Sequence, residues 1–234
     1  MDGQPSIGMA RARRDFDHFD EHADHLLIVD TSQHQSTIVG TYRLLRREAA
    51  ARAGGFYSIS EFDISALTKQ PGEILELGRS CIAMPYRSGR AIRLLWQAIV
   101  AYAFHYEIDI LFGCASLPGT DPYQHKLPLA YLHHFHRAPT YLRPNALLDR
   151  RVPMDQLAKE QISTREGMRA VPPLIRGYLR LGGFVGDGAV IDEEFRTTDV
   201  CVVVKTNQIA RRYARHYQKR LGRSDIHQPV LDPT

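Results

Sequence analysis

Glu76 and Arg79 are the two residues of this chain whose types and spacing most directly suggest chemistry. A carboxylate can take a proton from an amine that attacks a thioester, and an arginine can orient that carboxylate or an anionic group of a substrate. Positions three apart face opposite sides of a regular strand, so the two side chains converge only if a β-bulge lies between them. We expect that bulge at Gly78, and a structural ion pair on a sheet is the alternative.

A short basic loop follows this pair. Arg87, Ser88, Gly89 and Arg90 precede a run with helical spacing, and a helix N-terminus binds anions through its free backbone N–H groups. An acid–base candidate beside an anion site indicates group transfer from a donor that carries phosphate. The loop has a single glycine, so it supports a close backbone approach to a diphosphate less well than a GxGxxG loop would, and a solvated basic loop is the alternative.

The elements that must position these residues follow from hydrophobic periodicity, which predicts one α/β domain with a mixed sheet. The first two strands should form an antiparallel hairpin, and the apolar run at 108–117 should be central in the sheet. The expected strands are 25–30, 37–45, 73–82, 108–117, 184–191 and 198–205, and the expected helices are 91–106, 123–136, 154–168, 172–181 and 208–221.

Composition limits the classes of function. The chain has 234 residues, 44% of them apolar and 24% charged, and a net charge of +4, which fits a soluble domain and is too weakly basic to indicate nucleic acid. Cys81, Cys114 and Cys201 are widely spaced, so we expect buried free thiols and neither disulfides nor a zinc site. The histidines at 133–136 lack the spacing of metal ligands, so no metal is expected. There is no apolar run of ~20 residues and no signal peptide, which indicates a cytoplasmic protein.

The expected terminal helix at 208–221 carries five basic residues and no acidic one. Such a helix could touch the anionic inner membrane peripherally or meet an acidic carrier protein. A solvated basic face, with the apolar stripe packed on the core, is the alternative.

Five sequence blocks resemble the bacterial ornithine-lipid N-acyltransferases. That family is also described as hemolysin-like, and it belongs to the GNAT-like group that includes the acyl-homoserine-lactone synthases. The similarity runs from about Arg14 to Thr206. The blocks are ELGRSCI (76–82), YRSGRAI (86–92), LFGCASLPGTDP (111–122), VPPLIRGYLRLGG (171–183) and FRTTDVCVVV (195–204).

The resemblance implies a fold and an activity. The fold would be a GNAT-like three-layer α/β structure with a central mixed, mostly antiparallel β-sheet flanked by helices. The activity would be transfer of a 3-hydroxyacyl group from acyl carrier protein to the α-amine of L-ornithine, which gives lyso-ornithine lipid. The donor would arrive on the carrier's phosphopantetheine, with no tightly bound cofactor.

The resemblance also assigns residues. Glu76 and Arg79 would serve proton transfer and the acceptor, and backbone N–H groups at 79–82 would stabilise the oxyanion. The donor phosphate would be bound by Arg87, Ser88, Gly89 and Arg90. The other substrate contacts would come from Ser80, Ser116 and Asp121.

The expected organisation is an N-terminal arm (1–24), an acyltransferase domain (25–206) and a basic C-terminal helix and tail (207–234). Family members have a longer N-terminus that helps to wall the acceptor site, so we interpret 1–24 as a loose polar remnant of it. That interpretation leaves a late gene start, a more open acceptor site or an impaired enzyme as options. A related enzyme with another amino-acid acceptor, and a non-catalytic membrane- or carrier-binding homologue, are the alternative functions.

Overall fold

The computed structural model describes residues 15–32, 34–87 and 89–209. Its centre is an eight-stranded sheet in which β8 pairs with β10 and the other strands follow the order β1-β2-β4-β5-β10-β9-β7. β3 and β6 form a separate two-stranded sheet. The strands are β1 (Asp24–Asp30), β2 (Thr37–Arg46), β3 (Phe62–Asp63), β4 (Glu73–Ile82), β5 (Ile108–Pro118), β6 (Asn145–Ala146), β7 (Arg151–Val152), β8 (Phe184–Val185), β9 (Ala189–Asp192) and β10 (Thr197–Lys205).

All described strand pairs are antiparallel except β4 with β5. The sheet is therefore mixed and mostly antiparallel, as predicted, and β1 and β2 form the predicted hairpin. Two parallel neighbouring strands need a crossover connection. The helix predicted at 91–106 lies between β4 and β5 in the sequence and forms that connection. It is present as α4 (Gly89–His105).

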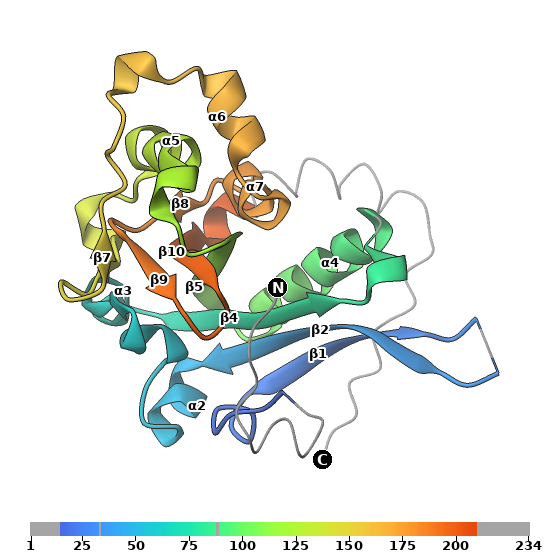
Figure 1. Cartoon of the computed structure of the whole chain (residues 1–234). Coiled ribbons are helices and arrows are strands. Elements are labelled where there is room, and N and C mark those ends of the chain that lie inside the picture. The colour runs from blue at the N-terminus through green and yellow to red at the C-terminus, as the bar shows by residue number, and fades with distance from the viewer. Residues whose placement is uncertain (1–14, 33, 88, 210–234) are drawn as a thin grey trace.

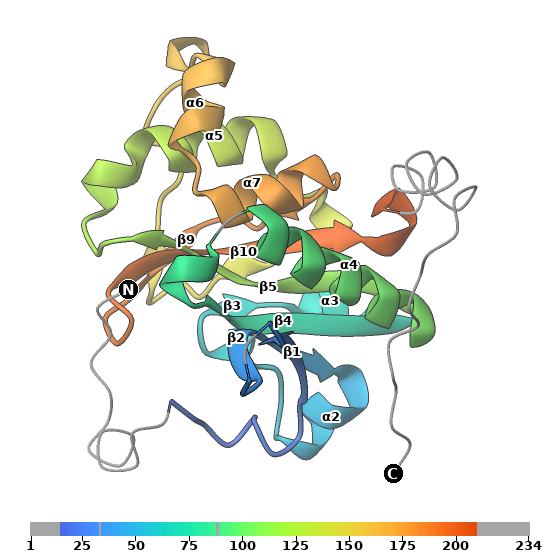
Figure 2. The ribbon, with the colours of Figure 1, turned by 90° about the vertical axis from the view of Figure 1, so that its right-hand side faces the viewer.

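Helices cover both faces of the sheet (Figures 1 and 2). On one face α4, α5 (Lys126–His136) and α7 (Pro173–Arg180) pack over the larger core, which includes Leu75, Leu77 and Trp96. On the other face α2 (Arg47–Arg52) and α3 (Ser65–Thr68) pack over a smaller core around Phe112. None of the helices in the described ranges is long and apolar enough to cross a bilayer.

Several predicted elements need correction. The helix expected at 154–168 begins only at Thr164, as α6 (Thr164–Ala170). The strand expected at 184–191 is divided into β8 and β9. The helix expected from Pro172 is present as α7, and Gly182 follows its end with a left-handed φ of 88°, a conformation that favours glycine. Cys81 is exposed, whereas Cys201 is buried as expected.

The N-terminal segment also differs from expectation. Asp15–Ala23 is not a loose arm, because Phe19 and Ala23 pack against the smaller core and three of its aspartates bind arginines on the sheet. The predicted basic helix at 208–221 lies outside the described residues apart from its first two positions.

β4 and β5 separate part-way along their length. Their pairing ends at Glu76 and Phe112, although β4 continues to Ile82 and β5 to Pro118. Gly113 lies at this fork, where an added Cβ would be 2.2 Å from the carbonyl oxygen of Leu77. The missing side chain lets the two backbones approach closely before they diverge.

We predict that Gly113→Ala lowers the free energy of unfolding by about 1–3 kcal/mol, because the new methyl group must displace the backbone of β4. Chemical denaturation measures this loss. Gly78→Ala is the matched control on β4, since its Cβ would lie 3.9 Å from its nearest neighbour, the Arg43 guanidinium. An equal loss in both variants would contradict a steric requirement at the fork.

Candidate functional site

A β-bulge interrupts β4 next to the expected position. The register pairs Arg43 with Gly78 and Thr41 with Cys81, so Arg79 and Ser80 together face the single residue Tyr42. Arg79 has a left-handed φ of 50°, which is uncommon for a residue other than glycine and is often found at functional sites. The bulge lies one residue beyond Gly78 and on the part of β4 that has separated from β5.

Glu76 is buried and fully engaged. Its exposed fraction is 4%, and its carboxylate accepts hydrogen bonds from the backbone N–H groups of Tyr57 and Ser58, both at 2.7 Å, and from the Ser58 hydroxyl. Burial raises the pKa of Glu76, and these three donors oppose the shift. The carboxylate thus fixes the start of a 3-10 turn (Tyr57–Ser60).

Arg79 binds two aspartates of the N-terminal segment. Its guanidinium donates to both carboxylate oxygens of Asp15 at 2.7 and 2.8 Å and to Asp17 at 2.9 Å. No hydrogen bond or ion pair joins Arg79 to Glu76 within the part of the chain that the structure describes. The bulge is therefore present, but the two side chains do not pair with each other, because other partners engage each of them.

Arg43 is the centre of this ion-pair network. It is 4% exposed and donates to Asp17 at 2.6 Å and to Asp20 at 2.9 Å, and its guanidinium lies 5.4 Å from the Phe19 ring centre and 5.5 Å from that of Tyr57. Burial alone would raise the pKa of Asp17, but Arg43 and Arg79 hold it below its usual value. The network fastens the N-terminal segment to β2 and β4.

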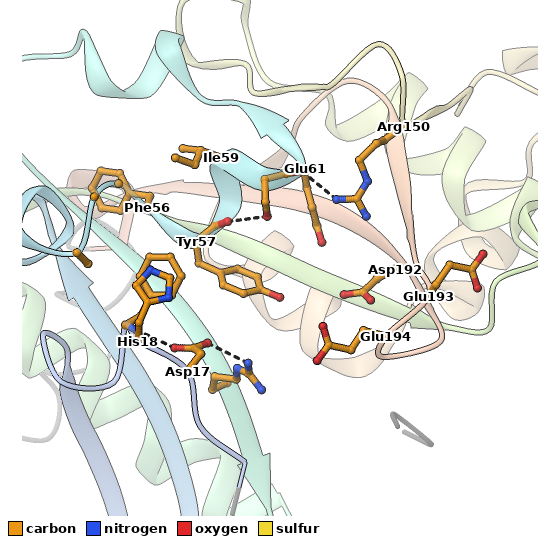
Figure 3. A pocket seen from close by; sticks show the side chains of 16 residues that line it. Asp17, His18, Phe56, Tyr57, Ile59, Glu61, Arg150, Asp192, Glu193 and Glu194 are labelled. Atoms are coloured by element: carbon orange, nitrogen blue, oxygen red, sulfur yellow. Dashed lines mark hydrogen bonds and ion pairs between the residues drawn. The ribbon is translucent and has the colours of Figure 1, made fainter. Parts of the chain in front are cut away.

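An open cleft of ≈ 680 Å³ lies beside this network (Figure 3). Tyr57 extends across it toward Asp192 and Glu194 (Figure 3). Arg79 connects the cleft to the separated half of β4. The lining consists of Asp17, His18, Phe19, Ala53, Gly54, Gly55, Phe56, Tyr57, Ile59, Ser60, Glu61, Arg79, Arg150, Asp192, Glu193 and Glu194.

Three carboxylates converge beside the cleft, and two of them, Glu61 and Asp192, line it. Glu61 follows the 3-10 turn, Asp192 ends β9 and Asp199 lies in β10, and one oxygen of each lies within 4.8 Å of the others. We call these residues the acidic cluster. Burial, then the charge of Asp199, raises the pKa of Glu61 to about 7. Burial also raises the pKa of Asp199 to about 6, with Asp192 adding to the shift.

The other predicted site residues divide between two places. Ser116 lies opposite Asp199 in the β5–β10 ladder, beside the acidic cluster. Arg87, which donates to the Ile82 carbonyl at 2.9 Å, lies with Gly89 and Arg90 at the exposed start of α4.

Three of those predictions need a separate comment. Ser88 lies outside the described residues. Ser80 is half-buried and faces Tyr42 in the bulge. Asp121 accepts from the Tyr123 N–H at 3.0 Å, so it caps a short 3-10 turn, at Pro122–His125.

Sequence reasoning missed Arg43, Glu61, Asp192 and Asp199. Asp199 carried a usable signal, since a carboxylate in the middle of the apolar run TTDVCVVVK is a candidate buried charge. Arg43 carried a similar signal, since it lies between Tyr42 and Leu44 in a predicted strand. Glu61 and Asp192 have polar or mixed neighbours in the sequence and show no such pattern.

Comparison with known proteins identifies the family. A protein-family model described as "Acetyltransferase (GNAT) domain" matches residues 1–97. A Rhizobium meliloti (strain 1021) protein named "L-ornithine N(alpha)-acyltransferase" is 46% identical over 228 residues, which cover 95% of this chain and 77% of that protein. A protein of the same name from Brucella abortus (strain 2308) is 46% identical over 217 residues, covering 90% and 77%.

Solved structures with a similar chain path are more distant. A CoA-dependent acyl-homoserine lactone synthase, BjaI, is 13% identical with a TM-score of 0.46, and the alignment covers 97% of this chain and 83% of that one. FeeM, an N-acyl amino acid synthase, is 8% identical with a TM-score of 0.41, covering 79% and 73%.

The mixed sheet with its flanking helices and the matching domain model define an acyltransferase of the GNAT fold. Within that class, the chain belongs to the L-ornithine N(alpha)-acyltransferase family, and its activity is that of an N-acyltransferase.

We predict that Arg43→Ala lowers the free energy of unfolding by roughly 2–4 kcal/mol, since it leaves two aspartates without their buried partner. Thermal and urea denaturation measure the loss. Arg52→Ala is the matched control, because the Arg52–Glu48 pair is exposed at 53% and 80% and should contribute less than about 0.5 kcal/mol. Similar losses in the two variants would rule out a structural role for the network.

We predict that Glu61→Gln raises the free energy of unfolding at pH 8 by roughly 1–3 kcal/mol. The native pKa of about 7 lies above the ordinary glutamate value of 4.5, so the ionised wild-type side chain opposes folding increasingly as pH rises from about 4.5 to 7. The gain should shrink at pH 5, where native Glu61 is protonated. Urea denaturation at both pH values measures it, and a gain of equal size at pH 5 would contradict this assignment.

Proposed function

We propose that the protein transfers a 3-hydroxyacyl group from the phosphopantetheine of acyl carrier protein to the α-amine of L-ornithine, giving lyso-ornithine lipid. The observation that carries the proposal is the junction of an opened β4 edge with an acidic cleft at Arg79. The open edge suits an acyl thioester, and the acidic cleft suits a cationic amino acid. The names of the relatives support ornithine as the acceptor.

The donor would lie between the separated halves of β4 and β5. In the described chain, no strand pairs with the β5-facing edge of β4 beyond Glu76, so backbone groups there can bond the amides of a pantetheine arm. The arm would end at the start of α4, where the helix N-terminus and the exposed Arg87 and Arg90 can hold its single phosphodiester.

The α-ammonium of the acceptor first loses one proton to solvent, which leaves the free α-amine as the nucleophile. The α-amine nitrogen forms a bond to the thioester carbonyl carbon, the carbon–sulfur bond breaks, and the proton lost by the amine ends on the departing pantetheine thiol. Backbone N–H groups on the bulged part of β4 (78–82) would stabilise the negative oxygen of the tetrahedral intermediate. No metal and no tightly bound cofactor enters this proposal.

Glu76 and Arg79 act in this proposal as positioning residues. Glu76 holds the turn that carries Tyr57 and leads to Glu61, because both of its oxygens accept hydrogen bonds from that turn. Arg79 holds the N-terminal segment that forms the opposite wall of the cleft. Their replacement would displace the walls rather than remove a proton acceptor.

The test is to incubate purified protein with 3-hydroxyacyl carrier protein and L-ornithine. We expect release of the free carrier thiol and a product whose tandem mass spectrum places the acyl group on the α-nitrogen. Acyl-coenzyme A is the comparison donor and should react at least tenfold more slowly. Absence of transfer from the carrier by folded protein would overturn the proposal, and faster transfer from coenzyme A would overturn its donor.

We further predict that the double variant Arg87→Ala/Arg90→Ala raises the KM for acyl carrier protein by roughly tenfold, on the order of 1.4 kcal/mol, with the KM for ornithine unchanged. Steady-state kinetics with each substrate varied in turn measures this. Arg165→Ala on α6 is the control, since that arginine is equally exposed but distant in the fold from α4. An unchanged KM for the carrier in the double variant would remove the basic loop from donor binding.

A further inference from the structure

The acidic cluster contains more negative charge than its surroundings balance. Glu61, Asp192 and Asp199 are 3%, 7% and 5% exposed, and none of them forms an ion pair with a lysine or arginine in the described ranges. Burying carboxylates without a positively charged partner costs folding free energy. Such carboxylates therefore occur mainly where a cation binds or where a carboxyl group stays protonated.

One oxygen of the cluster is left without a partner inside the protein. Asp199 Oδ1 is buried and makes no hydrogen bond, while Asp192 Oδ1 accepts from the backbone N–H of Phe195 and Glu61 from the Cys114 thiol. The Asp199 residue is only 5% exposed to solvent, and its carboxylate faces those of Glu61 and Asp192. The hydroxyls of Thr197 and Ser116 lower the pKa of Asp199, but Thr197 Oγ1 is itself without a hydrogen-bond partner. Asp199 Oδ1 is therefore free to accept a hydrogen bond from a bound donor.

The nearby Arg150 does not supply that donor. Its guanidinium donates to the carbonyl oxygens of Ser60 at 2.9 Å and Ile191 at 3.1 Å, so it connects the backbones on either side of the cluster. Its charge lowers the pKa of Glu61 and Asp199, but the raised values show that this effect is incomplete. The negative charge of the acidic cluster is therefore only partly balanced by Arg150.

The cleft gives a positively charged ligand access to the acidic cluster and limits the shape of that ligand. Glu61 and Asp192 line the cleft, and Phe56, Tyr57 and Ile59 supply apolar surface on the same side. An alkylammonium group has three N–H donors for three carboxylates, and its methylene chain can lie on that apolar surface.

We propose that Glu61, Asp192 and Asp199 form the subsite for the side-chain ammonium of the acceptor amino acid. This inference rests on the proposed function and adds the origin of its selectivity. An ammonium held by three carboxylates stays protonated and cannot attack the thioester. The free α-amine is then the only nucleophile of a diamino acid, so the subsite explains transfer to the α-nitrogen.

The test compares L-ornithine with L-norvaline, which has the same carbon chain and α-amine but no side-chain amine. For wild-type protein we expect kcat/KM to favour ornithine by roughly 10–100-fold, because hydrogen bonds between charged groups contribute to affinity on this scale. In Asp199→Asn and Asp192→Asn the preference should fall at least tenfold, through a higher KM for ornithine, with norvaline within about threefold of wild type. Glu194→Gln, which neutralises a cleft carboxylate outside the cluster, is the control and should change the preference for ornithine by less than about threefold.

Calorimetric binding of both amino acids to donor-free, EDTA-treated protein separates this inference from the proposed function. Wild-type protein should bind ornithine at least tenfold more tightly than norvaline, and Asp199→Asn should lose that difference even if no acyl transfer is found. Equal effects of Asp199→Asn on both amino acids would overturn the subsite, since the cluster would then serve the common α-amine. Ornithine binding that requires added Ca²⁺ or Mg²⁺ would overturn it as well, since the cluster would then be a metal site. Circular dichroism of each variant excludes loss of fold as the cause.

Discussion

The separation of β4 from β5 after Glu76 and Phe112 is the constraint on which the site depends. Two neighbouring parallel strands would normally satisfy each other's backbone groups over their whole length. Here Gly113 allows a close approach at the fork, and the bulge at Arg79 and Ser80 turns the free half of β4 away. The opened edge, the start of α4 and the cleft wall at Arg79 all follow from this single departure from regular pairing.

Two groups of charges surround the fork, and they differ in how they are balanced. Around Arg43 and Arg79, each arginine is matched by aspartates of the N-terminal segment, and the lowered pKa of Asp17 reflects that match. In the acidic cluster the pKa values of Glu61 and Asp199 are raised, because burial and like charges are not offset. The first group stabilises the walls of the cleft, whereas the second opposes folding and is suited to binding a positive charge.

Local patterns predicted much of the fold, and non-local contacts determined the rest. The alternation in 73–82 and the helical spacing after Gly89 gave β4 and α4 within two residues, because those signals lie within each element. A bulge near Gly78 was also predictable from the spacing of Glu76 and Arg79. Their partners were not, since Asp15 and Asp17 and the turn at Tyr57 reach them only through the fold. The acidic cluster could not be predicted, because Asp192 and Asp199 come together only through the pairing of β9 with β10, which no local sequence pattern indicates.

A crystal structure of the protein with L-ornithine bound would show whether the acidic cluster binds the acceptor. We predict that the side-chain nitrogen lies within hydrogen-bond distance of Glu61, Asp192 and Asp199, with the α-nitrogen directed toward the bulge in β4. An α-nitrogen bound in the acidic cluster, a metal ion in its place, or ornithine bound outside the cleft would contradict it.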